Sequence, residues 1–156
     1  MSVHEVASAG TSIWLDDLSR AKITGADAHS LPSRIANSGV VGVTTNPSIF
    51  SGAISGAAEY SADIAAMKGA TVDDVVKKLT TDDVRQACDL FAPIFSGSKG
   101  VDGRVSIEVD PRLARDTEGT IAAGKELWSI IDRPNVMIKV PATIECLPAI
   151  TALIAA

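Results

Sequence analysis

The stretch that decides the fold is Asn135–Thr143, which reads Asn-Val-Met-Ile-Lys-Val-Pro-Ala-Thr. Val136, Ile138 and Val140 alternate with a methionine and Lys139, and a period of two is typical of a β-strand. Because successive side chains of a strand point to opposite faces, the three aliphatic residues share one face and Lys139 lies on the other. The stretch therefore predicts a short strand with a lysine near its carboxyl end.

Similar runs of β-branched and other apolar residues occur three times upstream, at residues 12–15, 40–43 and 105–109. Each is predicted to form a short strand, and helical patterns lie between the later strands. Strand alternating with helix, without the turn residues of a β-hairpin, indicates right-handed crossovers and a parallel sheet. The expected fold class is therefore α/β.

The predicted helices are recognised by their apolar faces. Residues 72–79 place four apolar side chains on one stripe, with Thr71 in the N-cap position. A second helix starts near Thr81 and buries Cys88, and Pro93 bends or ends it. The remaining predictions are a helix over 114–131 that buries Ile121, Gly124, Trp128 and Ile131, and the start of another over 145–156.

Four strands are half of the eight that close a β/α barrel, a fold that typically takes about 250 residues. We therefore expect the 156 residues to form one domain, 1–156, with about the first four β/α units of a truncated (β/α)8 TIM barrel. Such a half barrel leaves its first and fourth strands as open edges. The isolated chain is accordingly expected to associate with itself.

Charge, cysteine and histidine content narrow the possible functions. The chain has 14 Lys and Arg against 19 Asp and Glu, a net charge of −5 and no basic stripe, so nucleic acid is not an expected partner. Two cysteines and two histidines predict neither a disulfide framework nor a metal site. Residues 1–10 lack the pattern of a secretory signal, and glycines interrupt the uncharged stretch 35–58. A cytoplasmic protein without a membrane helix is expected.

Polar residues gather at the carboxyl ends of the predicted strands. If the apolar faces meet the helices, Asp16, Asn46, Glu108 and Lys139 point into the barrel, and Thr44 shares the face of Asn46. Barrel enzymes place their chemistry at this end of the strands. Purely structural roles remain open for these residues. Lys139 could be an edge-strand lysine that keeps the sheet soluble, and Asp16 and Asn46 could be turn residues. Glu108, inside a run of aliphatic residues, is harder to explain in that way.

Lysine chemistry at such a site depends on protonation. An amine attacks a carbonyl only when it is neutral, so a catalytic lysine needs a desolvating site that lowers its pKa and groups that move protons. Carboxylates close to the amine stabilise the ammonium instead. Desolvation and proton sharing must therefore outweigh that attraction.

Four strings of residues follow one another along nearly the whole chain. They are Ser12–Arg20 (SIWLDDLSR), Gly42–Phe50 (GVTTNPSIF), Ser106–Leu113 (SIEVDPRL) and Asn135–Thr143 (NVMIKVPAT). Together they resemble the transaldolase family in its longer bacterial form. The resemblance implies a barrel of the class I aldolase type, of which this chain would be the N-terminal half.

The resemblance also implies an activity that needs no cofactor. Transaldolases transfer a dihydroxyacetone unit from sedoheptulose 7-phosphate to glyceraldehyde 3-phosphate, giving erythrose 4-phosphate and fructose 6-phosphate, in the non-oxidative pentose phosphate pathway. The partners would therefore be sugar phosphates. By the same resemblance Lys139 forms the Schiff base, Asp16 is the base of the retro-aldol step, and Glu108 positions a water for proton transfer. Asn46 and Thr44 would hold substrate hydroxyls.

The sequence departs from the family pattern in two ways. It stops at Ala156, so the later strands with the family's phosphate-binding arginine and serine are expected beyond it, and Cys146 stands where a small residue, often glycine, is expected. Three alternatives stay open. They are another lysine-dependent sugar-phosphate aldolase, a magnesium site of Asp16, Glu108 and Asp110, and a catalytically incompetent fragment that acts as a folded or interaction module.

Overall fold

A four-stranded parallel sheet forms the centre of the chain. The computed structural model describes residues 2–25 and 28–156. The strands are β1 (Ile13–Asp16), β2 (Val40–Thr44), β3 (Arg104–Glu108) and β4 (Val136–Lys139), and they lie in the order β1-β2-β3-β4. Each strand thus pairs with the next one in the chain, as successive strands of a β/α barrel do. The predicted α/β fold class is confirmed, with four β/α units present.

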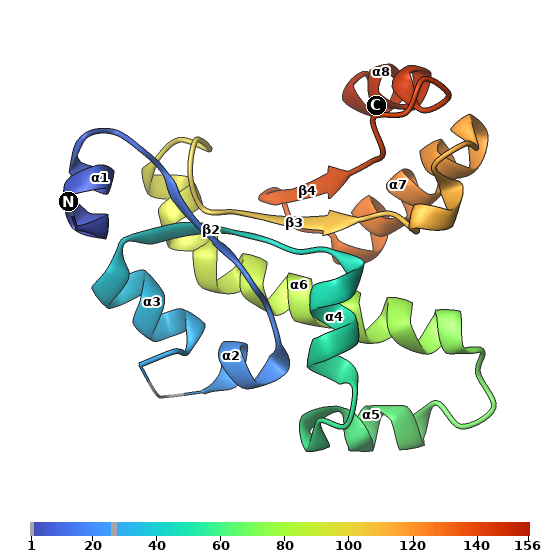
Figure 1. Cartoon of the computed structure of the whole chain (residues 1–156), viewed down its shortest axis with the longest axis horizontal. Coiled ribbons are helices and arrows are strands. Elements are labelled where there is room, and N and C mark those ends of the chain that lie inside the picture. The colour runs from blue at the N-terminus through green and yellow to red at the C-terminus, as the bar shows by residue number, and fades with distance from the viewer. Residues whose placement is uncertain (1, 26–27) are drawn as a thin grey trace.

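Helices connect these strands and pack on one side of the sheet (Figure 1). The α-helices are α1 (Val3–Ser8), α2 (Arg20–Thr24), α3 (Leu31–Ser38), α4 (Pro47–Ile54), α5 (Ser61–Ala66), α6 (Val72–Gly97), α7 (Thr117–Ile131) and α8 (Leu147–Ile154). Short 3-10 helices are η1 (Ala58–Tyr60) and η2 (Pro111–Leu113). The long helix α6 runs beneath β2 and β3 in Figure 1 and forms the main support of the sheet.

The hydrophobic core lies between the sheet and the helices α6 and α7. Val105 and Ile107 of β3 are buried there together with Phe91 of α6 and Ile131 of α7. Cys88 belongs to the same core, as predicted, and burial raises the pKa of its thiol to about 12. The aliphatic face of the strands therefore meets the helices, which leaves the polar face for the interior of a barrel.

That second face is partly covered by the ring of Trp14. The ring lies over Gly42 of the neighbouring strand, and a Cβ on Gly42 would sit 2.5 Å from it. A glycine is required at this position because any side chain would displace the indole. Met137 of β4, on the same face as Lys139, is 42% exposed. Solvent therefore reaches the inner face of the sheet near its β4 edge.

The predicted helix boundary at Thr81 is wrong, because residues 72–97 form the single helix α6, which runs through Pro93. The Thr81 hydroxyl donates a 2.8 Å hydrogen bond to the carbonyl of Lys77, one turn back. Threonine often satisfies its hydroxyl in this way inside a helix. Thr71 caps the start of α6, as predicted, by accepting from the backbone N–H of Asp74.

Two predicted buried faces are also wrong in part. Val72 and Val76 on the first turns of α6 are 78% and 42% exposed, and Trp128 of α7 is 51% exposed. Burial of α6 begins at Leu79. Figure 1 shows the reason for α6, whose first turns extend beyond the carboxyl ends of the strands, where no part of the sheet can cover them. On α7, Gly124 and Ile131 are buried as predicted.

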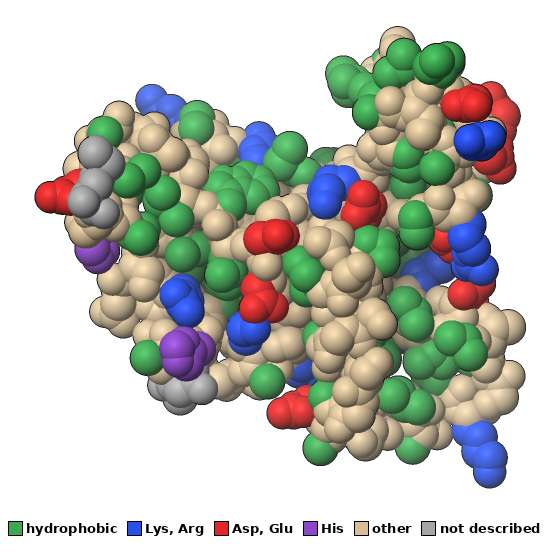
Figure 2. All heavy atoms as spheres, viewed as in Figure 1, with side chains coloured by type: hydrophobic (Ala, Val, Ile, Leu, Met, Phe, Trp, Pro, Cys, Tyr) green, Lys and Arg blue, Asp and Glu red, His purple; other side chains and the backbone are tan. Residues whose placement is uncertain are grey.

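The surface carries charges of both signs. Figure 2 shows Lys and Arg side chains interspersed with Asp and Glu over the visible face, without a continuous basic stripe. Among the helices of residues 2–25 and 28–156, none combines the length and the apolar character that crossing a bilayer requires.

Candidate active site

Lys139 and Glu108 meet at the carboxyl ends of β4 and β3. The two residues are register partners, and Lys139 Nζ lies 3.6 Å from Glu108 Oε2. The same ammonium donates a 2.8 Å hydrogen bond to the backbone carbonyl of Thr45, which directly follows β2. The side chains of Lys139 and Glu108 are 38% and 29% exposed. Lys139 Nζ therefore lies between two oxygen acceptors, at a point where solvent still reaches it.

Thr45 is held against β3 by two hydrogen bonds to Ser106. The Thr45 hydroxyl donates to the Ser106 carbonyl at 2.7 Å, and the Thr45 backbone N–H donates to the Ser106 hydroxyl at 3.4 Å. Ser106 in turn donates to the hydroxyl of Thr44 at 3.1 Å. Thr45 and Ser106 are buried. This network fixes the Thr45 carbonyl, which accepts the hydrogen bond from Lys139 Nζ.

Sequence reasoning did not find Thr45 and Ser106 as parts of the site. Ser106 lies on the same strand face as Glu108, so the alternation of β3 could have indicated it. Thr45 gave no such signal, because its contribution to Lys139 is a backbone carbonyl. Its side chain faces away from the polar set of β2.

Asn46 caps the helix that follows β2. Its side-chain Oδ1 accepts a 3.0 Å hydrogen bond from the backbone N–H of Ile49, and Pro47 occupies the first position of α4. A proline at this position is compatible with a helix start because its missing N–H is not needed there. The turn predicted for Asn46-Pro47 is thus a helix N-terminus. With Oδ1 engaged, the amide NH2 is the part of Asn46 that can donate to a ligand.

Asp16 lies on the opposite edge of the sheet from Lys139. It is the last residue of β1, is exposed, and pairs in register with Thr44. With two strands between β1 and β4, the sheet spacing places them about 14 Å apart along the sheet. Within the described part of the chain no hydrogen bond or ion pair joins Asp16 to Lys139 or Glu108. Only the curvature of a barrel can bring Asp16 towards the lysine.

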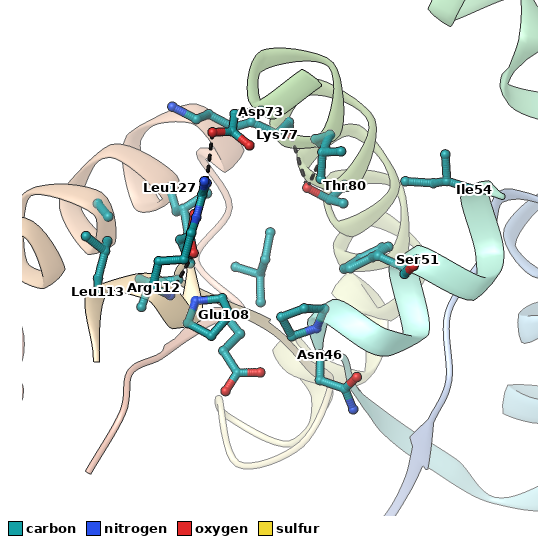
Figure 3. Close-up of a pocket in the computed structure, with 18 of the residues that line it drawn as sticks. Asn46, Ser51, Ile54, Asp73, Lys77, Thr80, Glu108, Arg112, Leu113 and Leu127 are labelled. Carbon is teal, nitrogen blue, oxygen red and sulfur yellow. Dashed lines mark hydrogen bonds and ion pairs between the residues drawn. The ribbon is translucent and has the colours of Figure 1, made fainter. Parts of the chain in front are cut away.

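A cavity of about 680 Å³ opens beside Glu108 and Asn46, between α4, α6 and α7. Figure 3 shows these two side chains at one end of the cavity and a contact between Arg112 and Asp73 at the other. Arg112 donates to Asp73 at 2.8 Å and to Asp110 at 2.7 Å. The hydrogen bond from Arg112 lowers the pKa of the Asp110 carboxyl, although partial burial opposes this. Arg112 therefore pairs with two carboxylates. Because Asp73 belongs to α6, the pair links the segment after β3 to that helix.

The three carboxylates of the alternative magnesium site do not converge. Glu108 faces Lys139, Asp110 is bound to Arg112, and Asp16 lies on the far edge strand. Among residues 2–25 and 28–156, no group of three or more His, Cys, Asp or Glu side chains could hold a metal ion.

Cys146 packs inside the loop that follows β4. The residue is fully buried, and its Sγ lies 3.4 Å from the hydroxyl of Thr120 on α7. Its backbone N–H donates to the hydroxyl of Thr143 at 3.3 Å. A thiol at this point thus joins the loop to α7.

Comparison with known proteins identifies the relatives of this fold and site. A family model described as "Transaldolase/Fructose-6-phosphate aldolase" matches residues 13–156. A protein named "Transaldolase" from Mycolicibacterium smegmatis is 56% identical over 152 residues, which cover 96% of this chain and 40% of that protein. Proteins of the same name from Arthrobacter sp. (strain FB24) and Saccharopolyspora erythraea are 54% and 51% identical, with 97% and 99% of this chain covered and 41% of each relative.

Four parallel β/α units with a lysine and a glutamate at the ends of adjacent strands define a protein of the aldolase-barrel class. The chain belongs to the transaldolase/fructose-6-phosphate aldolase family, so the resemblance seen in the four motifs is confirmed. It spans about 40% of the length of the curated relatives that it matches.

Proposed function

We propose that this chain carries the imine-forming part of a transaldolase. The observation that supports it most is the position of Lys139 Nζ, which lies between the Thr45 carbonyl and the Glu108 carboxylate at the carboxyl end of the sheet. Relatives at 51–56% identity bear the name transaldolase. The proposed reaction moves a dihydroxyacetone unit from sedoheptulose 7-phosphate to glyceraldehyde 3-phosphate, in the cytoplasmic, non-oxidative branch of the pentose phosphate pathway.

Imine formation is the first chemical step of this proposal. The neutral Lys139 amine attacks the ketose carbonyl carbon, the carbonyl oxygen takes up a proton, and the resulting carbinolamine loses water to give the protonated Schiff base. At 3.6 Å from Nζ, Glu108 is too far for a good direct hydrogen bond. A water between the two groups would relay the protons, which is the role proposed for Glu108.

Carbon–carbon cleavage is the second step. The Schiff base withdraws electrons while Asp16 takes the proton of the substrate C4 hydroxyl, the C3–C4 bond breaks, and an aldose leaves with a three-carbon enamine still bound to Lys139. The enamine then attacks the aldehyde of the acceptor and the imine is hydrolysed. No cofactor is needed because the imine itself is the electron sink. Asn46 and Thr44 would hold hydroxyls of the three-carbon unit.

Borohydride trapping tests the nucleophile directly. Reduction of the complete enzyme, with the later strands of the barrel present, should fix an adduct on Lys139 in the presence of fructose 6-phosphate, and peptide mass spectrometry can locate it. Lys139→Arg should abolish the adduct because a guanidinium keeps its proton and cannot form an imine. Lys77→Arg, a change at a lysine that pairs with Glu126 on α7 and does not contact Lys139, is the matched control and should trap normally. An adduct on a different lysine, with Lys139 unmodified, would exclude the assignment.

The acceptor dependence separates transaldolase from a lysine-dependent aldolase. A transaldolase should convert fructose 6-phosphate efficiently only when erythrose 4-phosphate is supplied, because the enamine waits for an aldehyde. Free dihydroxyacetone released at the same rate without an acceptor would favour the aldolase. Trapping without any cleavage would favour a folded module without turnover.

We also propose that the isolated chain associates with itself and turns over little substrate. Within the described residues β1 and β4 each pair with a strand on one side only, so backbone donors and acceptors are free at both edges. The open inner face leaves Lys139 accessible to water. Sedimentation combined with a coupled transaldolase assay tests both points. A stable monomer with activity close to that of the longer relatives would contradict the proposal.

A further inference from the structure

A buried polar network lies beneath the segment that follows β1. Arg20, the first residue of α2, is 14% exposed, and its guanidinium lies 2.9 Å from Asp83 Oδ1. Asp83 comes from the middle of α6 and is fully buried. Tyr60, which is 1% exposed, donates its hydroxyl to Asp83 Oδ2 at 2.7 Å. Both carboxylate oxygens of Asp83 therefore have a partner inside the protein.

The network holds the backbone of Arg20 as well as its side chain. The backbone N–H of Arg20 donates to the hydroxyl of Tyr60 at 2.9 Å. The guanidinium also stacks over the Tyr60 ring, 4.7 Å from its centroid, and pairs with Asp63 at its outer edge. A side chain and a main-chain atom fixed by the same two groups have little freedom to shift. We call Arg20, Tyr60 and Asp83 the Arg20 anchor.

Three residues separate this anchor from Asp16. Leu18 is fully buried, and the hydroxyl of Ser19 caps α2 by accepting from the backbone N–H of Lys22. Asp17 pairs with Lys22. The residues that follow Asp16 are therefore held by contacts with the helices. Asp16 itself is exposed, and its carboxylate forms no hydrogen bond or ion pair among the described residues.

The sheet holds β1 from one side. Among the described residues the strand lies at an edge and pairs with β2 alone, and its register shifts between Ile13 and Trp14. Such irregularities twist a strand and disrupt its ladder locally. The pairing is regular from Trp14 to Asp16, so the sheet holds the carboxyl end of β1 on one side. The Arg20 anchor, four residues after Asp16, is a buried polar contact that fixes the chain where it leaves that end.

We propose that Asp83 and Tyr60 are positioning residues for Asp16, acting through Arg20. The inference rests on the proposed role of Asp16 as the base of carbon–carbon cleavage. Helix α6 also packs against β2 and β3. The anchor therefore fixes the segment after Asp16 relative to the helix that supports the strand of Glu108. The fully buried Asp83 thereby couples the two edges of the site.

Two variants test the inference against a matched control. Tyr60→Phe removes one hydroxyl while keeping the ring, and Asp83→Asn removes the charge while keeping the shape. Asp89→Asn changes another aspartate of α6, which pairs with Arg133 at the surface, and should behave as the wild-type chain. Hydrogen exchange should speed up at residues 15–20 in the two anchor variants and stay unchanged at residues 136–139.

The functional readout compares two steps on fructose 6-phosphate in single turnover, measured in the complete enzyme with the later strands of the barrel present. Borohydride trapping on Lys139 should proceed at the wild-type rate in Tyr60→Phe and Asp83→Asn, whereas release of glyceraldehyde 3-phosphate should fall by up to roughly 10²-fold. A purely structural role would lower both steps together.

Distinct outcomes separate this inference from the proposed function. Equal acceleration of exchange in all segments, unchanged exchange at 15–20, or wild-type cleavage by a variant with faster exchange there would overturn the positioning role. If Asp16→Ala cleaves as fast as the wild type, the role of Asp16 fails, and the exchange data still decide whether the anchor holds that segment. If Asp83→Asn does not fold, the milder Tyr60→Phe provides the decision.

Discussion

The two edges of the proposed site are built in different ways. At the β3–β4 edge, parallel register places Glu108 opposite Lys139, and the hydroxyl network around Ser106 adjusts the position of one carbonyl. At the β1 edge, Asp16 ends a strand whose register shifts at its amino end, and a buried ion pair between Arg20 and Asp83 lies just beyond it along the chain. We therefore propose that backbone pairing positions the imine-forming pair, whereas a side-chain network positions the cleavage base. Mutations at the two edges should therefore fail in different ways.

The largest effect is expected from Asp16→Ala. If Asp16 is the cleavage base, the variant should still accumulate the Schiff base on Lys139 while carbon–carbon cleavage falls by about 10²–10⁴-fold. Rapid mixing followed by borohydride quenching measures the two steps separately. Parallel loss of trapping and cleavage would show that the β1 edge acts on imine formation as well.

Removal of the Arg20 cation should have the next largest effect, on stability. Arg20→Met leaves the fully buried Asp83 carboxylate without its counter-ion, and breaking a buried pair in this way costs about 3–5 kcal/mol. Urea unfolding followed by circular dichroism measures the loss. Lys78→Met, which breaks the exposed pair with Asp82 on the same helix, should cost about 0.5 kcal/mol or less. Similar losses in both variants would mean that the anchor is no stronger than a surface pair.

Glu108→Gln should slow imine formation and release at the β3–β4 edge. The glutamine keeps the shape and can still hold a water, but it cannot take up a proton. We expect a loss of about 10²-fold in the trapping rate, the low end for a general base. Cleavage of an imine that has already formed should be little affected. Equal trapping rates for the wild type and Glu108→Gln would remove the proposed role.

A smaller effect is expected from Ser106→Ala. The change leaves the buried backbone N–H of Thr45 without its hydroxyl partner, and an unsatisfied buried donor costs about 1–3 kcal/mol. Because the Thr45 carbonyl then loses its fixed direction, trapping at Lys139 should slow while exchange at residues 15–20 stays unchanged. Faster exchange at 15–20 would show that the two edges are not independent.

Alternation in the sequence predicted the β3–β4 edge well. Aliphatic residues at every second position of both strands identified Glu108 and Lys139 as inward-facing, and parallel register brought them to one level. Such a pattern is local and depends only on burial of one strand face. The fold class followed from the same signal.

The β1 edge and several helices could not be predicted in the same way. Arg20, Tyr60 and Asp83 come from three separate elements, and nothing in their local sequence shows that they meet. The short helices α2 to α5 have five to eight residues each, which is too short for an apolar face to repeat, and α2 and α3 are marked by their caps Ser19 and Ser30. The continuity of α6 was missed because a threonine inside a helix and a threonine cap look alike in sequence.

The smallest predicted effect uses pH to contrast Asp83 of the anchor with Asp110 of the cavity. Hydrogen bonds from Arg112 hold the pKa of Asp110 below the ordinary value of 3.8. Its contribution to folding is therefore present above that value and is lost as pH falls through the lower folded value. Burial raises the pKa of Asp83 above 3.8, although Tyr60 and Arg20 oppose this by donating hydrogen bonds. Its contribution is fully present below 3.8 and is lost as pH rises through the folded value.

The two carboxylates should thus give pH dependences of opposite sign. Asp110→Asn removes the loss of stability below pH about 4, so its free energy of unfolding should approach that of the wild type as the solution becomes more acidic. Asp83→Asn removes a contribution that declines above pH about 4, so its deficit relative to the wild type should shrink from there towards neutral pH. Urea unfolding at a series of pH values measures both differences. Parallel curves for the wild type and Asp83→Asn would mean that burial of Asp83 is fully compensated by its partners, and the anchor would then stabilise the fold without a titrating charge.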